Sequence, residues 1–255
     1  FVHSSTFPVS SRTLFDYHKR PGVLQRLTPV WSPVEVLRQD EGLDVGVQVH
    51  LKMKVAGVPV ELQVEHTEFE YGAFFVDEQR SGPFQSWRHE HRVESTPDGT
   101  SRLIDTIQYE LPYGPMGSLG AGKVERDLAR LFRFRHARTL NDLIRLKGGE
   151  GQRPGTIAIS GASGLIGRAL TSFWEMAGVT VLPLVRRDLR PGERAISWDP
   201  KRETIDGKKL EEVDVLVHLA GENVGAGRWT AERKSQILES RRDGTRLLAK
   251  ALASL

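Results

Sequence analysis

Hydrophobic and polar positions alternate along much of the first half of the chain, and this period of two predicts β-strands. The clearest case is Val45 to Val55, in which every second residue is apolar, and Val58 to Val64 repeats the pattern after Gly57. A glycine between two alternating runs is typical of a β-hairpin turn. Further strands are predicted at residues 1–9, 69–76, 84–93 and 101–111, the last two joined by the turn Thr96-Pro97-Asp98-Gly99.

Helical spacing appears three times in the same half. Ser10 or Ser11 can cap a short helix through Tyr17, and Pro21-Gly22 leads into a second short helix, Val23 to Leu27. After the breaker Tyr113 to Gly117, residues 122–147 have the length and spacing of one long helix. Its expected apolar stripe is Val124, Leu128, Leu131, Phe132, Leu140, Leu143 and Ile144, and its expected solvated arginines are Arg126, Arg130, Arg133, Arg135 and Arg138. Residues 1–148 are therefore predicted to be an α+β domain, a curved antiparallel sheet closed by a long C-terminal helix, with room for a cavity between them.

The pattern changes after the glycine-rich polar segment 149–154, which we interpret as a linker. Residues 155–255 contain apolar, β-branched runs of strand length at 156–160, 179–185, 193–198 and 213–219, the last predicted to be buried. Helical patterns lie at 165–177, 230–237 and 244–252. Strands that alternate with helices predict an α/β domain with a parallel sheet.

The glycine motif between the first strand and helix of this second domain points to a binding site. Gly161 would make a tight turn, Gly164 would let a pyrophosphate approach the backbone, and Gly167 would let the helix pack closely on the strand. The helix N-terminus would then direct its free N–H groups at the phosphates. Because the motif lies within a βαβ unit, we interpret it as a dinucleotide site; the alternative is a glycine turn without function.

The end of the second strand of this unit bears on the choice of dinucleotide. An NAD site usually has Asp or Glu there for the ribose 2′-hydroxyl, whereas this chain has Arg186 and Arg187. Guanidinium groups pair well with a 2′-phosphate, so NADP is predicted over NAD. The alternative is two solvated arginines in a loop.

Composition narrows the function classes. The 255 residues include no Cys, which excludes disulfides and cysteine chemistry, and there is neither a long apolar run nor a signal peptide. We therefore expect a cytoplasmic protein without a membrane span. Residues 151–255 carry 17 Lys and Arg against 13 Asp and Glu, which suits a polyanionic cofactor but is too dispersed to indicate nucleic-acid binding.

His89 and His91 fall on one face of a predicted strand, together with Trp87, at a spacing compatible with metal ligation. No third ligand is evident in the sequence. We predict that these residues line a cavity, without a metal.

The second domain resembles the atypical, NAD(P)-dependent epimerase/dehydratase-like members of the short-chain dehydrogenase/reductase superfamily. The motifs that carry the resemblance are Gly161 to Gly167, Trp198-Asp199-Pro200, His218 to Glu222, Gly227-Arg228-Trp229 and Ser240 to Thr245. The resemblance implies that Ser163, Leu165 and Ile166 line the pyrophosphate and that Asp199 contacts the adenine. It also implies that Leu219, Ala220 and Gly221 let the cofactor lie against the end of the fourth strand. Alternatively, Asp199 only caps a turn and Ala220-Gly221 is simply a strand end.

The first domain resembles START-like, helix-grip domains of the polyketide cyclase/dehydrase type, on the order of its elements together with His18 to Gly22 and Leu27 to Trp31. The resemblance implies an apolar small-molecule ligand. In the related subgroup such a domain can precede the reductase domain.

The superfamily's chemistry normally needs a Tyr-x-x-x-Lys pair and a Ser or Thr. The tyrosines are Tyr17, Tyr71, Tyr109 and Tyr113, and none has Lys four residues on. The chain ends at Leu255, before the expected fifth strand, so we interpret it as a fragment with an incomplete Rossmann domain and name no catalytic residue. Two functions remain open: an NADP-dependent oxidoreductase or epimerase-like enzyme with an accessory ligand domain, and a non-catalytic sensor of nucleotide and hydrophobic ligand.

Overall fold

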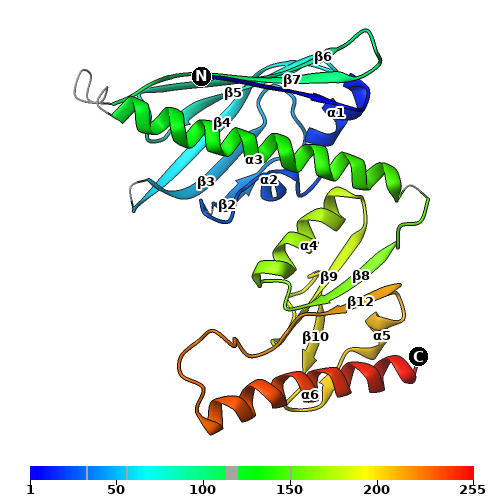
Figure 1. The fold of residues 1–255 in the computed structure, drawn as a ribbon. Coiled ribbons are helices and arrows are strands. Elements are labelled where there is room, and N and C mark those ends of the chain that lie inside the picture. The colour runs from blue at the N-terminus through cyan, green and yellow to red at the C-terminus, as the bar shows by residue number, and fades with distance from the viewer. Residues whose placement is uncertain (33, 56, 113–119, 150) are drawn as a thin grey trace. The chain divides into compact units, whose positions relative to one another are not determined.

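The computed structural model describes residues 1–32, 34–55, 57–112, 120–149 and 151–255, so the predicted breaker at residues 113–117 lies outside the described residues. The chain divides into two compact units, Phe1–Gly148 and Gly149–Leu255 (Figure 1). Within the described ranges, no helix combines the length and apolar character that crossing a membrane requires.

The first unit is a seven-stranded antiparallel sheet with strand order β1-β7-β6-β5-β4-β3-β2, across which one long helix, α3, lies (Figure 1). Its elements are β1 (Val2–Phe7), α1 (Ser11–His18), α2 (Val23–Arg26), β2 (Glu35–Gln39), β3 (Gln48–Val55), β4 (Val58–Glu70), β5 (Phe74–Ser81), β6 (Ser86–Ser95), β7 (Ser101–Glu110) and α3 (Ala121–Gly148). The antiparallel sheet and the long helix confirm the predicted α+β architecture.

Local signals in the sequence explain most of these boundaries. The Ser10 hydroxyl accepts the Thr13 N–H at 3.2 Å and caps α1, as predicted. The predicted hairpin is confirmed, with Val55 opposite Val58. The single strand predicted over residues 69–76 is wrong. Gly72 adopts φ +81°, a left-handed conformation that ends β4 and turns the chain into β5.

The buried face of α3 is more polar than its apolar stripe predicts. Leu128, Phe132 and Leu143 are buried as expected, but Ile144 is 55% exposed. The polar side chains that the helix buries are His136, Thr139 and Asp142. The expectation that Arg135 is solvated is also wrong, because its Nε is buried and the side chain lines an interior cavity. The polar side chains of α3 can be buried because polar groups of the sheet and of the two short helices face them.

A buried ion pair joins the short helices to α3. Arg26 donates two hydrogen bonds to the Asp142 carboxylate, each 2.8 Å long, and the Tyr17 hydroxyl donates a third at 3.2 Å. Asp142 is fully buried. Burial and the neighbouring Asp142 carboxylate both raise the pKa of Tyr17, so its hydroxyl remains a donor.

The second unit is a five-stranded sheet with strand order β11-β10-β9-β8-β12, parallel except for β11. Its elements are β8 (Thr156–Ser160), α4 (Leu165–Met176), β9 (Thr180–Val185), β10 (Ile196–Asp199), β11 (Thr204–Ile205), α5 (Gly207–Leu210), β12 (Val215–His218) and α6 (Ala231–Ala253). Ala158, Leu182, Leu184, Ile196 and Trp198 pack against Leu247 and Leu248 of α6. The parallel α/β pattern is confirmed.

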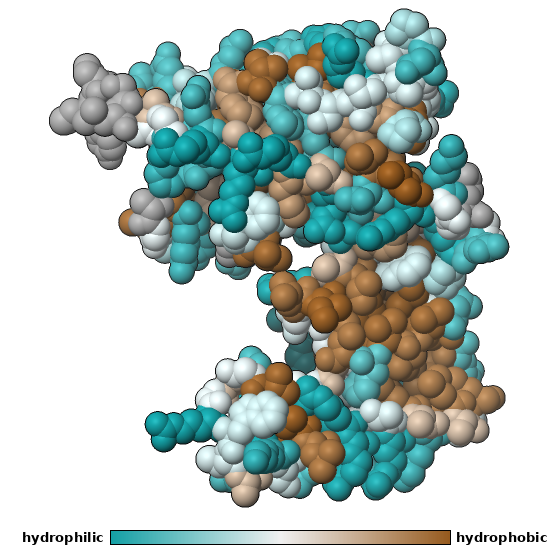
Figure 2. Space-filling model, viewed as in Figure 1, coloured by the Kyte–Doolittle hydropathy of each residue, from teal (hydrophilic) through white to brown (hydrophobic). Residues whose placement is uncertain are grey.

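Two expectations for this unit are wrong. The strand β12, which is predicted to be buried, is only partly buried, since Val215 is 42% exposed. Figure 2 shows a patch of hydrophobic surface on the visible face of this unit. The helices predicted at residues 230–237 and 244–252 are one helix, α6. A glycine suits position 244 inside this helix, because the methyl group of a larger residue would lie only 3.0 Å from the His218 Nε2.

We predict that Arg26→Met destabilises the first unit by about 3–5 kcal/mol, because it leaves the Asp142 charge buried without its partner. Hydrogen exchange of α3 peptides, measured by mass spectrometry on the full chain, reports this loss, and peptides of the second unit are the internal control. The double variant Arg26→Met with Asp142→Asn removes the charge and keeps an acceptor for Tyr17, so it should recover part of the loss. Equal losses in the two variants would contradict the explanation.

Candidate nucleotide-binding site

The predicted site residues of the second unit gather at the carboxyl ends of its parallel strands. From β8 the chain continues to β9 and β10 on one side, and β12 then returns to pair with β8 on the other side. The strand order therefore reverses between β8 and β12. In open parallel sheets, ligands bind in the crevice at such a switch point.

The glycine loop lies at this switch point, directly after β8. Gly161 adopts φ +71°, and a methyl group built on it would lie 2.9 Å from both the Ala220 nitrogen and the Leu219 carbonyl carbon. A methyl group on Gly167 would lie 2.2 Å from the Gly161 oxygen. Side chains are excluded at both positions because backbone fills the space. The glycine loop and the segment after β12 thus form one packed backbone unit.

Gly164 is the N-cap of α4, and among the residues that the structure describes no side chain caps this helix end. The Gly164 N–H donates to the Gly161 carbonyl at 3.0 Å, which closes the loop. Ser163 is exposed, and Leu165 and Ile166 are 65% and 62% exposed. An uncapped helix N-terminus with exposed residues around it attracts an anionic group, because the amide dipoles give it a partial positive charge.

Ser160 is a residue that the sequence reasoning missed. Its buried hydroxyl oxygen accepts the N–H groups of Leu219 at 3.1 Å and Ala220 at 3.2 Å. The same oxygen lies 2.6 Å from His218 Nδ1. Burial lowers the pKa of His218, which favours the neutral ring. The signal in the sequence that could have identified Ser160 is its position at the end of a buried strand, directly before the first glycine of the motif.

The two arginines after β9 differ in their surroundings. Both are exposed. Arg187 forms a forked ion pair with Glu193, with contacts of 2.9 and 2.5 Å. The Arg187 guanidinium and the Arg190 backbone N–H, which both donate to the Glu193 carboxylate, hold its pKa at about 2. Arg186 shows no hydrogen bond or ion pair within the described ranges. The structure therefore leaves Arg186 available for a ligand and Arg187 engaged.

Asp199 ends β10, the neighbour of β9 on the side away from β8. One of its carboxylate oxygens accepts the N–H groups of Lys201 at 2.9 Å and Arg202 at 3.3 Å. It therefore caps the turn into β11, which is the alternative that the sequence left open. The structure places it at the same edge of the sheet as the glycine loop.

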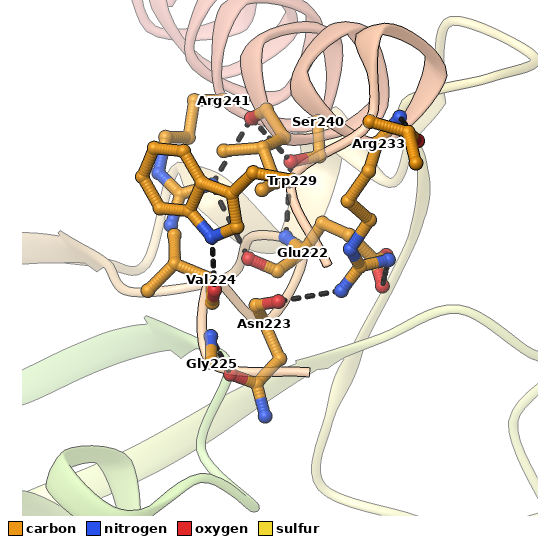
Figure 3. A network of polar contacts seen from close by, with 10 residues as sticks. Glu222, Asn223, Val224, Gly225, Trp229, Arg233, Ser240 and Arg241 are labelled. Atoms are coloured by element: carbon orange, nitrogen blue, oxygen red, sulfur yellow. Dashed lines mark hydrogen bonds and ion pairs between the residues drawn. The ribbon is translucent and has the colours of Figure 1, made fainter. Parts of the chain in front are cut away.

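A network of polar contacts fixes the loop that follows β12 to α6 (Figure 3). The Glu222 N–H donates to the Ser240 hydroxyl, and its carboxylate accepts from Arg233, each at 2.9 Å. Trp229 donates its ring N–H to the Val224 carbonyl at 2.9 Å. A methyl group on Gly221 would lie 3.2 Å from the Arg241 guanidinium carbon. The charged and small residues between 221 and 241 that take part in this network thus hold the loop against α6.

The first unit has a separate polar interior. The cavity there has a volume of about 20 Å³, room for one water molecule. Its lining residues are His18, Leu27, His91, Leu103, Asp105, Phe132, Arg135, His136 and Thr139. A larger apolar ligand would have to displace these side chains. His91 lines this cavity as predicted, whereas His89, predicted to line it as well, is not among the lining residues. Asp77, which the sequence reasoning missed, lies beside both histidines.

Burial and ion pairing act in opposite directions in this interior. Burial disfavours the charged form of His91, yet the Asp105 and Asp77 carboxylates outweigh it and raise the His91 pKa to about 9. Burial also opposes the charge of Asp77 and Asp105, but the neighbouring histidines hold both carboxyl pKa values below their usual range. His18 has a pKa lowered to about 4 by burial and by His91.

Comparisons with known proteins match the two units of the chain to two different families. Residues 7–133 match the family described as polyketide cyclase/dehydrase and lipid transport, and residues 157–255 match the NAD dependent epimerase/dehydratase family. An epimerase family protein of Mycobacterium bovis is 39% identical over 97 residues, 38% of this chain and 32% of the relative. A human epimerase family protein is 34% identical over 98 residues, 38% of this chain and 31% of the relative. The chain thus spans about a third of these relatives.

A solved structure resembles the whole chain. It is the nucleoside-diphosphate sugar epimerase from Corynebacterium glutamicum, with a TM-score of 0.78 and 30% identity. The match covers 100% of this chain and 52% of that one.

We predict that Gly167→Ala destabilises the second unit by about 1–3 kcal/mol, the usual cost of overpacking. The added methyl group would displace the backbone of the glycine loop, since the Gly161 oxygen lies 2.2 Å from its position. Gly207→Ala is the matched control, because nothing lies within 4 Å of its added methyl group. Proteolysis of the full chain in increasing urea measures both variants. Equal resistance of Gly167→Ala and Gly207→Ala would show that the loop is not tightly packed.

Proposed function

We propose that this chain, which joins a polyketide cyclase/dehydrase-type domain to a domain of the NAD dependent epimerase/dehydratase family, binds NADP at the carboxyl edge of its second sheet. The observation that carries the proposal is the glycine loop at the switch point between β8 and β12. On this proposal the second unit is a Rossmann domain and the first a helix-grip domain.

On this proposal, Asp199 at the end of β10 contacts the adenine, and the residues around the glycine loop take the following tasks. Gly161 and Gly167 shape the loop, and the first amides of α4 after Gly164 bind the pyrophosphate beside Ser163. Leu165 and Ile166 cover the pyrophosphate with their exposed side chains. The opposite wall of the crevice is formed by Leu219, Ala220 and Gly221, and the Ser160 hydroxyl holds the first two by their N–H groups. When bound, the nicotinamide ring of the cofactor accepts or donates a hydride.

NADP is proposed over NAD because of the side chains at the end of β9. No carboxylate directly follows that strand, and Arg186 is exposed and has no ion pair within the described ranges. A guanidinium group makes strong charge-assisted hydrogen bonds with a phosphate. We assign the 2′-phosphate contact chiefly to Arg186, with Arg187 contributing when it leaves Glu193.

The reaction proposed is that of an epimerase- or reductase-like enzyme, in which the first domain helps to bind an apolar substrate. A second candidate is a sensor that binds nucleotide and hydrophobic ligand without catalysis. The four tyrosines all belong to the first 113 residues, and their position does not decide between the two candidates. Among residues 149–255 of this chain there is thus no tyrosine to act as acid or base.

We predict that the full chain binds NADPH more tightly than NADH in titration calorimetry. Arg186→Ala should weaken NADPH binding by about 10- to 150-fold, which corresponds to about 1.5–3 kcal/mol for a lost charge-assisted contact. It should leave NADH binding nearly unchanged, because NADH lacks the 2′-phosphate. Arg187→Ala should have the smaller effect, since Glu193 already engages that side chain.

Lys208→Ala, an exposed change on α5, is the control for a general loss of positive charge. Equal losses of NADPH and NADH affinity in Arg186→Ala would disprove the 2′-phosphate assignment. Absence of binding for both nucleotides by the unmodified chain would disprove the cofactor proposal itself.

A further inference from the structure

We propose that Asp77, His89 and His91 form a binding site for a divalent transition metal ion, of the zinc type, inside the first unit. This site is separate from the nucleotide site and does not depend on it. Within the described ranges, these three residues are the group whose possible ligand atoms come together, all within 4.8 Å of one another.

The register of three neighbouring strands brings these side chains together. Asp77 of β5 lies directly opposite His89 of β6, and His91 of β6 lies directly opposite Asp105 of β7. Because side chains two residues apart share one face of a strand, His89 and His91 point to the same side of the sheet. That side is the one that α3 covers, as the contact between the rings of His89 and Phe132 shows.

The distances match a metal site better than a set of direct ion pairs. Asp77 Oδ2 lies 3.3 Å from His89 Nδ1 and 3.4 Å from His91 Nε2. Charge-assisted hydrogen bonds are shorter, about 2.7–2.9 Å. In a tetrahedral zinc site with bonds of about 2.0–2.1 Å, the ligand atoms lie about 3.3–3.4 Å apart. The Asp77 carboxylate oxygen thus stands from each of the two imidazole nitrogens at the spacing that such an ion imposes, and the three atoms all lie within 4.8 Å of one another.

Asp105 supports the two histidines from the other side. Its Oδ1 lies 3.0 Å from His89 Nε2 and 2.6 Å from His91 Nδ1. In both rings, the nitrogen that faces Asp77 is therefore opposite a nitrogen that faces Asp105. Metal-binding histidines almost always direct their second ring nitrogen to a carboxylate or carbonyl, which fixes the ring and its tautomer.

A third histidine fixes the supporting carboxylate. His136 of α3 lies with its Nε2 at 2.6 Å from Asp105 Oδ2, and its Nδ1 is 2.8 Å from the Ser5 hydroxyl of β1. Asp105 and His136 are 2% and 3% exposed. This chain of contacts, from β1 through α3 to β7, holds the proposed ligands in position before an ion binds, and preorganisation of this kind favours binding.

Charge also suits a dication. Asp77 and Asp105 place two carboxylates in a largely buried region, where charge is costly unless it is paired. In the chain without metal, the neighbouring histidines are their partners. A dication bound to the imidazole nitrogens would supply this pairing instead.

The first test uses the full chain, freed of metal by chelation and titrated with Zn²⁺ and with Co²⁺. We expect one ion per chain in calorimetry and, for Co²⁺, the visible absorption of a tetrahedral site. X-ray absorption of the zinc-loaded chain should show two imidazole ligands. This measurement tests the proposal without any substitution. Absence of stoichiometric binding, or a bound ion without two imidazoles, would overturn it.

Variants then identify the ligands. Asp77→Asn and His91→Gln should abolish stoichiometric Zn²⁺ binding, whereas Asp105→Asn should weaken it by about 10- to 100-fold, the usual effect of losing a supporting carboxylate. His50→Gln is the control, because this histidine lies on β3, outside the cluster. Circular dichroism checks that each variant is folded. Unchanged zinc affinity in a folded Asp77→Asn or His91→Gln would overturn the assignment.

Discussion

The nucleotide-binding edge of the second unit depends on the close approach of two backbone segments. The Gly161 backbone lies so near the Leu219–Ala220 peptide that not even a methyl group fits between them. Ser160 reinforces the approach, because its hydroxyl accepts both amide groups of that segment. The helix α4 must begin directly after this contact, and it begins with an uncapped N-terminus. One steric constraint therefore places the loop, the helix end and the wall of the crevice together.

The interior of the first unit is organised by a carboxylate rather than by apolar packing alone. Asp105 contacts histidines from its neighbouring strand and from α3, and Asp142 performs a similar task for the two short helices. Buried charges of this kind tolerate little change, because removal of one partner leaves the other unpaired. The family match describes lipid transport, whereas the cavity seen in this structure has a volume of only about 20 Å³. The characteristic chemical feature of this interior is therefore its set of buried carboxylates and the histidines and other polar groups that pair with them.

The two units present different chemistry in one chain. The second brings exposed backbone amides and a cationic side chain to one sheet edge, which suits an anionic nucleotide. The first brings imidazoles and carboxylates into a largely buried space, which suits a cation. The epimerase from Corynebacterium glutamicum has the same succession of folds across the whole of this chain. The pairing is therefore an architecture that this chain shares with a nucleoside-diphosphate sugar epimerase.

The sequence by itself determined those elements whose signals are local. Alternation defined the hairpin of β3 and β4, Ser10 marked the start of α1, and the glycine spacing located the loop before α4. Tertiary structure alone decided which polar residues are buried, because that depends on partners distant in the sequence. Asp77 joins His89 only through strand register, and Arg186 differs from Arg187 only because Glu193 lies beside the latter. Local patterns specify faces and turns, whereas register and packing decide which faces meet.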